Sequence, residues 1–133
     1  MEQGAKILVV DDDPDIVEAV TTVLEAHGHQ VISAANGALG LEMLRKEKPD
    51  LMILDLLMPK LDGFAVLKEL RHRRWAKYRK IPIIVLSSIR KDVSDRRYEL
   101  ETGSPLQVNA YVEKPVNPHS LMAHVQKLLG KKT

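Results

Sequence analysis

Hydrophobic and polar positions alternate along the chain in blocks that predict strands and helices by turns. Short runs rich in valine, isoleucine and leucine, apolar at nearly every position, are typical of strands buried on both faces, whereas apolar residues every three or four positions indicate helices. The strand-like runs span residues 6–10, 30–34, 51–54, 81–86 and 110–112. Each run is short, as expected of the central strands of a covered sheet.

The helical pattern fills the gaps between these runs. It spans residues 14–27, 39–48, 64–70, 92–100 and 118–129. Pro14 suits a first helical turn, an acid just ahead of it can cap the helix, and Pro49 ends the second helix. Regular strand–helix alternation predicts an α/β fold, in which helices cover both faces of a doubly wound, five-stranded parallel sheet.

Composition narrows the class without changing this picture. With 133 residues, of which 44% are hydrophobic and 29% charged, we expect one soluble domain over residues 1–133. We find no apolar run long enough for a bilayer and no leader-like start, so a cytoplasmic protein with no membrane contact is expected. The sequence has no cysteine, which excludes thiol nucleophiles and zinc–thiolate sites, and the formal net charge of +2 is too small to indicate nucleic-acid binding by itself.

Polar side chains follow four of the five predicted strands. Asp11 and Asp12 come after the first, Asp55 after the third, Ser87 after the fourth and Lys114 after the fifth. Ligands of open parallel sheets bind beyond the carboxyl ends of the strands, so we expect these groups to converge. Three clustered carboxylates require a cation, for which Mg²⁺ or Mn²⁺ is suited, and a lysine with a hydroxyl can bind phosphoryl oxygens. Taken singly, the acids are equally explained as helix caps and the others as turn residues.

The motifs around these residues resemble those of two-component response-regulator receiver domains, in the usual order. The matching segments are residues 9–14, 51–59, 62–63, 83–87 and 111–115. The resemblance implies a flavodoxin-like strand order 2-1-3-4-5 and a cis bond between Lys114 and Pro115. It also implies a role for each site residue: Asp55 as phosphoacceptor, Asp11, Asp12, Asp55 and the carbonyl of Leu57 as metal ligands, Ser87 as switch hydroxyl, Lys114 as phosphoryl partner and Tyr111 as rotating aromatic.

The resemblance further implies a phosphorylation-dependent switch, a phosphoprotein of phosphorelay signal transduction and not an enzyme. Its phosphoryl group would come from a sensor histidine kinase or a phosphotransfer protein, and its output would be binding to a downstream protein that the sequence does not name; a homodimer stays open. Segments 98–100, 108–111 and 114–116 are similar to stand-alone, chemotaxis-regulator-like receivers paired with phytochrome-like histidine kinases. Residues 101–107 extend a loop that is shorter in the family, and serine stands at position 87, where threonine is commoner.

Three other functions compete with this interpretation. A haloacid-dehalogenase-like phosphatase also uses an aspartyl nucleophile, but after its first strand rather than its third. A nucleic-acid binder is suggested by the basic stretch 68–80, which contains Trp75 and Tyr78. We interpret this stretch as the solvated end of the third helix, or as a docking patch for an acidic partner, so nucleic acid is not the expected partner. A receiver-like adaptor that is never phosphorylated is the third alternative.

Two apolar residues bear on the lifetime of a phosphorylated state. Leu57 lies two residues after Asp55, and Ile89 lies two residues after Ser87. In receivers these positions flank the path of attacking water, where polar side chains can orient it. We expect leucine and isoleucine to shield the phosphoryl group and slow its hydrolysis, although Leu57 could instead pack locally and Ile89 could point into solvent.

Overall fold

The computed structural model describes residues 4–130 and has a parallel five-stranded sheet at its centre. The strands are β1 (Lys6–Val10), β2 (Gln30–Ala34), β3 (Leu51–Leu54), β4 (Ile83–Ser87) and β5 (Ala110–Glu113). They lie in the order β2-β1-β3-β4-β5, and every neighbouring pair is parallel. The doubly wound, flavodoxin-like order expected from the sequence is confirmed.

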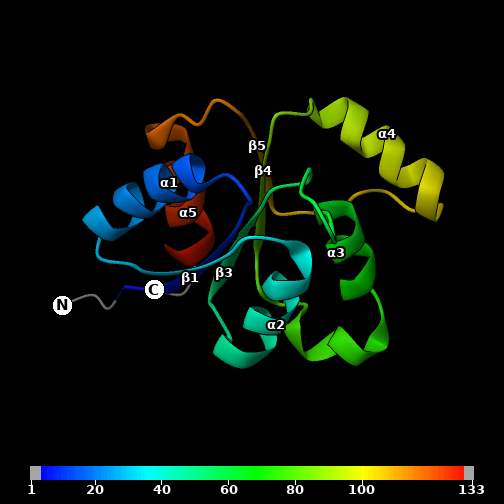
Figure 1. The fold of residues 1–133 in the computed structure, drawn as a ribbon, viewed down its shortest axis with the longest axis horizontal. Coiled ribbons are helices and arrows are strands. Elements are labelled where there is room, and N and C mark those ends of the chain that lie inside the picture. The colour runs from blue at the N-terminus through cyan, green and yellow to red at the C-terminus, as the bar shows by residue number, and fades with distance from the viewer. Residues whose placement is uncertain (1–3, 131–133) are drawn as a thin grey trace.

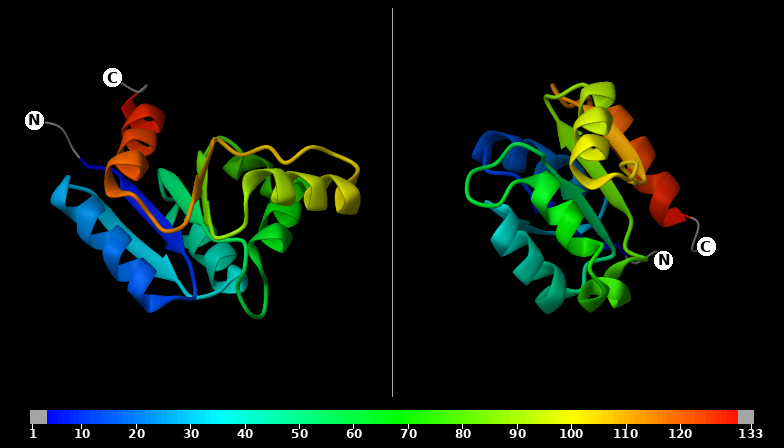
Figure 2. Two further views of the ribbon diagram at one scale, coloured as in Figure 1. Left: turned by 90° about the horizontal axis from the view of Figure 1, so that it is seen from above. Right: turned by 90° about the vertical axis from the view of Figure 1, so that its right-hand side faces the viewer.

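Helices cover both faces of this sheet. They are α1 (Pro14–Ala26), α2 (Gly37–Glu47), α3 (Gly63–Leu70), α4 (Lys91–Thr102) and α5 (Pro118–Gly130), with a 3₁₀ helix η1 (Arg73–Tyr78) after α3. In Figure 1, α1 and α5 lie on one side of the strands and α2, α3 and α4 on the other. The two views of Figure 2 show the same division into three layers. Within residues 4–130, no helix is long and apolar enough to cross a lipid bilayer.

Alternating side chains of the strands build two separate cores. Ile7 and Val9 of β1 belong to the cluster beneath α1 and α5, whereas Leu8 and Val10 belong to the cluster beneath α2 and α3. All four are at most 1% exposed. Burial on both faces explains why the strands carry unbroken apolar sequence instead of an alternating pattern.

Several predicted boundaries are wrong by one or two residues, for local reasons. Helix α2 begins at Gly37, ahead of the predicted residue 39, because the Asn36 side chain caps it by accepting the amide hydrogen of Leu39 at 2.9 Å. Strand β4 begins at Ile83 rather than 81, because the Ile81 amide still bonds to the Tyr78 carbonyl of η1 at 3.2 Å. Helix α4 runs from 91 to 102, so the extended segment loses residues 101 and 102 to the helix.

Only the beginning of the basic stretch 68–80 belongs to the end of the third helix, so that interpretation is wrong for most of the stretch. Helix α3 ends at Leu70 and the chain continues as η1, whose first turn is capped by His72 through its Nδ1, at 3.3 Å from the amide nitrogen of Arg74. Trp75 and Tyr78 of η1 point inward and are 3% and 8% exposed. The basic residues therefore surround a short helix that is fastened to the core by two aromatic rings.

Candidate functional site

The carboxyl ends of β1 and β3 bring three acids together. The backbone amide of Asp55 donates to the Val10 carbonyl at 2.9 Å, which places Asp55 beside the end of β1. Carboxylate oxygens of Asp11, Asp12 and Asp55 all lie within 4.8 Å of one another. Asp11 and Asp55 are 3% and 4% exposed and Asp12 is exposed, so the cluster has a buried base and an open side.

The three aspartates that follow β1 have two different roles, one in capping α1 and the other in the acid cluster. Asp13 caps α1, because its side chain accepts the amide hydrogen of Asp15 at 2.9 Å. Asp11 instead accepts the amide hydrogen of Asp13 at 3.0 Å through one oxygen, and its other oxygen faces the cluster. The helix-cap explanation therefore holds for Asp13, while Asp11 and Asp12 are left for the site.

Lys114 supplies a positive charge inside the cluster. Its Nζ lies 3.0 Å from Oδ2 of Asp11 and 3.5 Å from Oδ2 of Asp55. The backbone amide of Lys114 donates to the Ser87 carbonyl at 2.8 Å, which ties the end of β5 to the end of β4. The bond between Lys114 and Pro115 is cis, as predicted.

Burial and neighbouring charges together shift the pKa values of Asp55 and Lys114. Burial raises the pKa of the Asp55 carboxyl and the negative charge of Asp11 raises it further, which outweighs the opposing effects of Lys114 and of the backbone amides of Leu57 and Leu56. For Lys114, burial lowers the pKa, but the hydrogen bond to Asp11 and the charges of both acids overcome it, so the pKa lies above its ordinary value. Closely packed carboxylates with hard oxygen atoms fit Mg²⁺ or Mn²⁺.

Ser87 and Tyr111 lie on the same side of the sheet, next to the start of α4. Ser87 is fully buried, and its Oγ accepts the amide hydrogen of Ile89 at 3.2 Å. The Tyr111 hydroxyl donates to the Ile89 carbonyl at 2.7 Å and shares a 2.7 Å hydrogen bond with Oγ of Ser94. Burial raises the pKa of the Tyr111 hydroxyl, so the ring carries a neutral donor near pH 7.

Leu57 and Ile89 differ in exposure. Leu57 is 47% exposed, and its backbone amide donates to Oδ1 of Asp55 at 3.3 Å. Ile89 is partly buried and packs against the core on the α2 and α3 side, so it does not simply point into solvent. Whether the two side chains slow hydrolysis stays a prediction.

Two residues that support the site were missed by sequence reasoning. Gly63 begins α3, donates to the Leu56 carbonyl at 3.0 Å, and lies so close to the loop after β3 that an added Cβ would stand 2.2 Å from the Asp55 carbonyl oxygen. Ser94 is fully buried in α4, a helix whose neighbouring residues are mostly charged. The sequence pointed to Gly63 only as part of a turn and of the matching segment 62–63, with no sign of its close contact with Asp55, and a lone serine gave no signal.

Comparison with known proteins assigns the chain to a described family. The family model for the response regulator receiver domain matches residues 7–126. The "Probable transcriptional regulator ycf27" of Porphyridium aerugineum is 42% identical over 127 residues, which cover 96% of this chain and 49% of that protein. Protein PilH of Pseudomonas aeruginosa is 34% identical over 126 residues, covering 95% and 98%. The chain thus spans about half the length of the ycf27 relatives and nearly all of PilH.

Solved structures give the same result. A putative response regulator from Chloroflexus aurantiacus superposes with a TM-score of 0.80 at 31% identity, covering 96% of this chain and 99% of the other. The receiver domain of sensor histidine kinase PA1611 from Pseudomonas aeruginosa, solved with a magnesium ion coordinated in its active site cleft, has a TM-score of 0.80 at 27% identity, covering 96% and 98%. The fold of this chain is therefore shared along almost its whole length.

Proposed function

Because the chain belongs to the response regulator receiver domain family, we propose that Asp55 is its phosphoacceptor and that the chain forms one receiver domain. Receiver domains act in two-component systems as phosphorylation-dependent signalling switches. The observation that supports Asp55 is its position: a buried carboxylate at the end of β3, within 4.8 Å of two other acids and 3.5 Å from an ammonium group.

The acids would hold a divalent cation, Mg²⁺ or Mn²⁺, with Asp11, Asp12, Asp55 and the backbone carbonyl of Leu57 as ligands. Support comes from the three carboxylates, which are hard oxygen donors gathered around a buried base with an open side for water. When bound, the cation supplies positive charge that offsets the negative charges of the acids and of phosphoryl oxygens.

Phosphoryl transfer requires little covalent chemistry from the protein. A carboxylate oxygen of Asp55 forms a bond to phosphorus, while the bond from phosphorus to the imidazole nitrogen of a donor phosphohistidine breaks and its electron pair stays with that nitrogen. Lys114 would neutralise charge on the transferred group, and the Ser87 hydroxyl can rotate to donate to one of its oxygens. The donor would be a sensor histidine kinase or a phosphotransfer protein.

The output would begin at Ser87. Since the Ser87 hydroxyl bonds to the Ile89 amide and the Ile89 carbonyl bonds to Tyr111, a shift of Ser87 toward a phosphoryl group would move the partner of the tyrosine. Tyr111 is also bonded to Ser94 of α4, so the same shift would reach that helix. We propose that a downstream protein reads this change, in keeping with Tyr111 as the rotating aromatic.

The alternatives make different predictions for one experiment. The protein is incubated with acetyl phosphate and Mg²⁺ and analysed by intact mass, and the same reaction is run with excess EDTA and with Asp55→Asn. Asp15→Asn, which changes an exposed aspartate of α1, is the matched control. We expect one added phosphoryl group in wild type and in Asp15→Asn, and none with EDTA or in Asp55→Asn.

Other outcomes select the rivals. Equal labelling of Asp55→Asn would remove Asp55 as the acceptor. Labelling of no variant under any condition would favour an adaptor that is never phosphorylated, and steady turnover of a phosphate ester, tested separately, would favour a phosphatase. Asp55 follows the third strand rather than the first, which argues against the phosphatase.

A further inference from the structure

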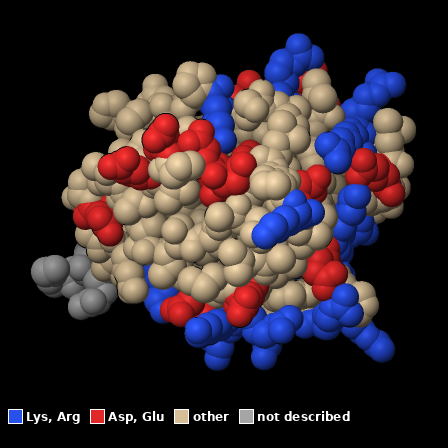
Figure 3. Space-filling model, viewed as in Figure 1, with Lys and Arg blue, Asp and Glu red and all other residues tan. Residues whose placement is uncertain are grey.

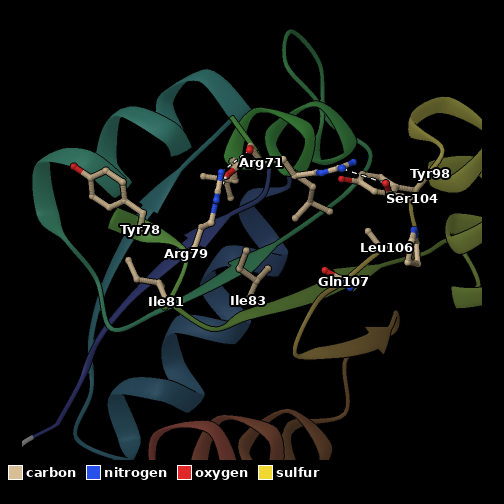
Figure 4. Close-up of a pocket in the computed structure, with 12 residues that line it drawn as sticks. Arg71, Tyr78, Arg79, Ile81, Ile83, Tyr98, Ser104, Leu106 and Gln107 are labelled. Carbon is tan, nitrogen blue, oxygen red and sulfur yellow. Dashed lines mark hydrogen bonds between the residues drawn. The ribbon is translucent and has the colours of Figure 1, made fainter. Parts of the chain in front are cut away.

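A pocket of about 420 Å³ lies at the end of the sheet opposite to the acid cluster. Ile83, which lines it, begins β4, whereas Ser87 ends the same strand beside the site. Figure 4 shows the pocket between the segment around Arg79 and Ile81 on one side and the loop carrying Ser104 and Leu106 on the other. Its volume falls in the range of about 300–1,000 Å³ that is typical of ligand pockets.

Both apolar and polar side chains line the pocket. The aliphatic ones include Leu67 and Leu70 of α3, Ile81 just before β4, Ile83 at the start of β4, and Leu106 of the loop that follows α4. All of these side chains except Leu67 are partly exposed, so a ligand can contact them. Leu106 belongs to the loop between α4 and β5, and this loop forms one wall of the pocket.

Two guanidinium groups stand at the rim. The Arg71 side chain donates to Oγ of Ser104 at 3.1 Å, which spans the pocket as a bridge from the end of α3 to the loop (Figure 4). Arg79 donates to the carbonyls of Leu70 and Arg71, the last acceptors of α3. Both guanidinium groups are therefore held in place by neutral partners and keep further N–H donors available.

Most basic residues of the stretch 68–80 have no acidic partner among the described residues. In the stretch 68–80, Lys68 pairs with Glu101 and Arg74 pairs with Glu69. The other basic residues there form no ion pair with any acid of residues 4–130; they are Arg71, Arg73, Lys77, Arg79 and Lys80. Figure 3 shows lysine and arginine side chains along the lower edge of the molecule, with some acidic side chains among them, and further acidic side chains toward α1.

The nature of the pocket favours a protein ligand over a nucleic acid. Binding to single strands uses exposed aromatic rings on which bases stack. Trp75 and Tyr78, the aromatic residues of the basic stretch, are 3% and 8% exposed and serve the core. The pocket itself is lined by aliphatic side chains, by the largely buried Tyr78 and Tyr98, and by Arg71 and Arg79, which suits a large apolar side chain flanked by carboxylates.

We propose that this pocket, with the basic surface around it, binds an acidic protein segment that carries one large apolar side chain. The apolar side chain enters between Ile83 and Leu106, and the flanking carboxylates pair with Arg71 and Arg79. Because the pocket and the acid cluster lie at opposite ends of β4, a partner held here leaves Asp55 accessible.

The test measures binding of a fluorescein-labelled peptide with four glutamates on each side of one phenylalanine, by fluorescence anisotropy with the unphosphorylated full chain. Gln107→Glu adds a negative charge to the pocket lining with almost no change of shape, and Gln126→Glu adds the same charge on α5, across the sheet. Arg71→Gln removes a rim charge, and Arg96→Gln, on the exposed side of α4, is its matched control.

We expect Gln107→Glu and Arg71→Gln each to raise the Kd about fivefold, the upper end for partly exposed ion pairs, and both controls to leave it nearly unchanged. For the wild-type protein, replacing the phenylalanine of the peptide by serine should raise the Kd by at least the same factor. Amide NMR shifts on titration should be largest at 83, 106 and 107.

Several results would overturn the proposal. One is equal weakening by Gln107→Glu and Gln126→Glu, which would mean that only net charge matters. Another is binding that ignores the loss of phenylalanine. A third is tighter binding of a random single-stranded DNA of equal charge that Gln107→Glu weakens more than Gln126→Glu does, which would make the surface a nucleic-acid site. NMR shifts confined to α5 would place the peptide elsewhere. Thermal melting curves of all four variants are recorded alongside, and a melting temperature equal to that of wild type ensures that a change in Kd does not reflect unfolding.

Discussion

Lys114 lies closer to Asp11 than to Asp55, at 3.0 Å against 3.5 Å between its Nζ and the respective Oδ2 atoms. The ammonium group thus shares its charge between a proposed metal ligand and the proposed phosphoacceptor. We therefore expect this one side chain to influence cation binding and phosphoryl transfer in opposite directions.

Replacing Lys114 by methionine should separate these two effects. A unit charge several ångströms from a divalent ion costs about 1 kcal/mol even at a water-like dielectric constant, so Lys114→Met should tighten Mg²⁺ binding about fivefold. The same variant should accept phosphate from acetyl phosphate at least tenfold more slowly, because the transferred group loses a counter-charge. Calorimetric titration with Mg²⁺ and time-resolved intact mass measure the two quantities. Weaker Mg²⁺ binding in a folded variant would contradict the argument.

The exposed Leu57 and the half-buried Ile89 should lengthen the life of the phosphorylated state. Leu57→Asn and Ile89→Glu each place a polar group where water approaches the aspartyl phosphate, and we expect each to speed phosphate loss about tenfold, the low end for a positioned polar group. The decay of phosphorylated protein is followed by intact mass at fixed Mg²⁺. Leu39→Asn, at an exposed leucine of α2, controls for a general effect of polarity. If neither site variant decays faster than this control, the shielding idea is wrong.

Gly63 should be intolerant of a methyl group. An added Cβ would stand 2.2 Å from the Asp55 carbonyl oxygen and 2.7 Å from the Leu56 Cα, so either α3 or the loop after β3 must shift. We expect Gly63→Ala to lower the free energy of unfolding by about 2 kcal/mol and to slow phosphorylation as well. Urea unfolding provides the first measurement. Gly130→Ala, where a methyl group meets no neighbouring atom, is the control and should be neutral or slightly stabilising.

Glu69 should make stability depend on pH in acid. Hydrogen bonds from Arg74 and then from Trp75 lower the pKa of its carboxyl from 4.5 to about 2. The folded state therefore binds the proton less well than the unfolded state. The stabilisation that the ionised Glu69 provides is fully present above pH 4.5 and is lost as the pH falls toward 2. Glu69→Gln should flatten the fall of stability over that interval, measured by urea unfolding with Trp75 fluorescence. A slope equal to that of wild type, or an equal flattening in Glu25→Gln, would contradict the assignment.

The sequence predicted the sheet and the converging site because both depend on short-range patterns. Unbroken apolar runs mark strands buried on both faces, and the residue that ends such a strand must lie at its carboxyl edge, so Asp11, Asp55 and Lys114 could be placed without knowing any contact. For single residues in the loops, however, neither composition nor periodicity predicts how far the side chain is exposed. Leu57 and Ile89 look alike in sequence and differ in exposure because only one of them has a core to pack against.

What the sequence could not predict depends on contacts between distant segments. Gly63 is required by the approach of α3 to the loop after β3, which exists only in the folded chain. The stretch after Leu70 has helix-forming residues, yet it forms η1 because the inward packing of Trp75 and Tyr78 decides its course. Ser94 becomes notable only when Tyr111, seventeen positions later, meets it.

The separation of the two cores by a single sheet has an evolutionary consequence. Side chains such as Val9 and Val10 point to opposite faces, so a substitution beneath α1 and α5 and another beneath α2 and α3 share few neighbours. Their effects on stability should be close to additive, with little epistasis between them. The core on the side of Leu106 and the pocket can therefore accept substitutions without constraining those in the opposite core. Neither set of substitutions requires a change in the acids at the strand ends.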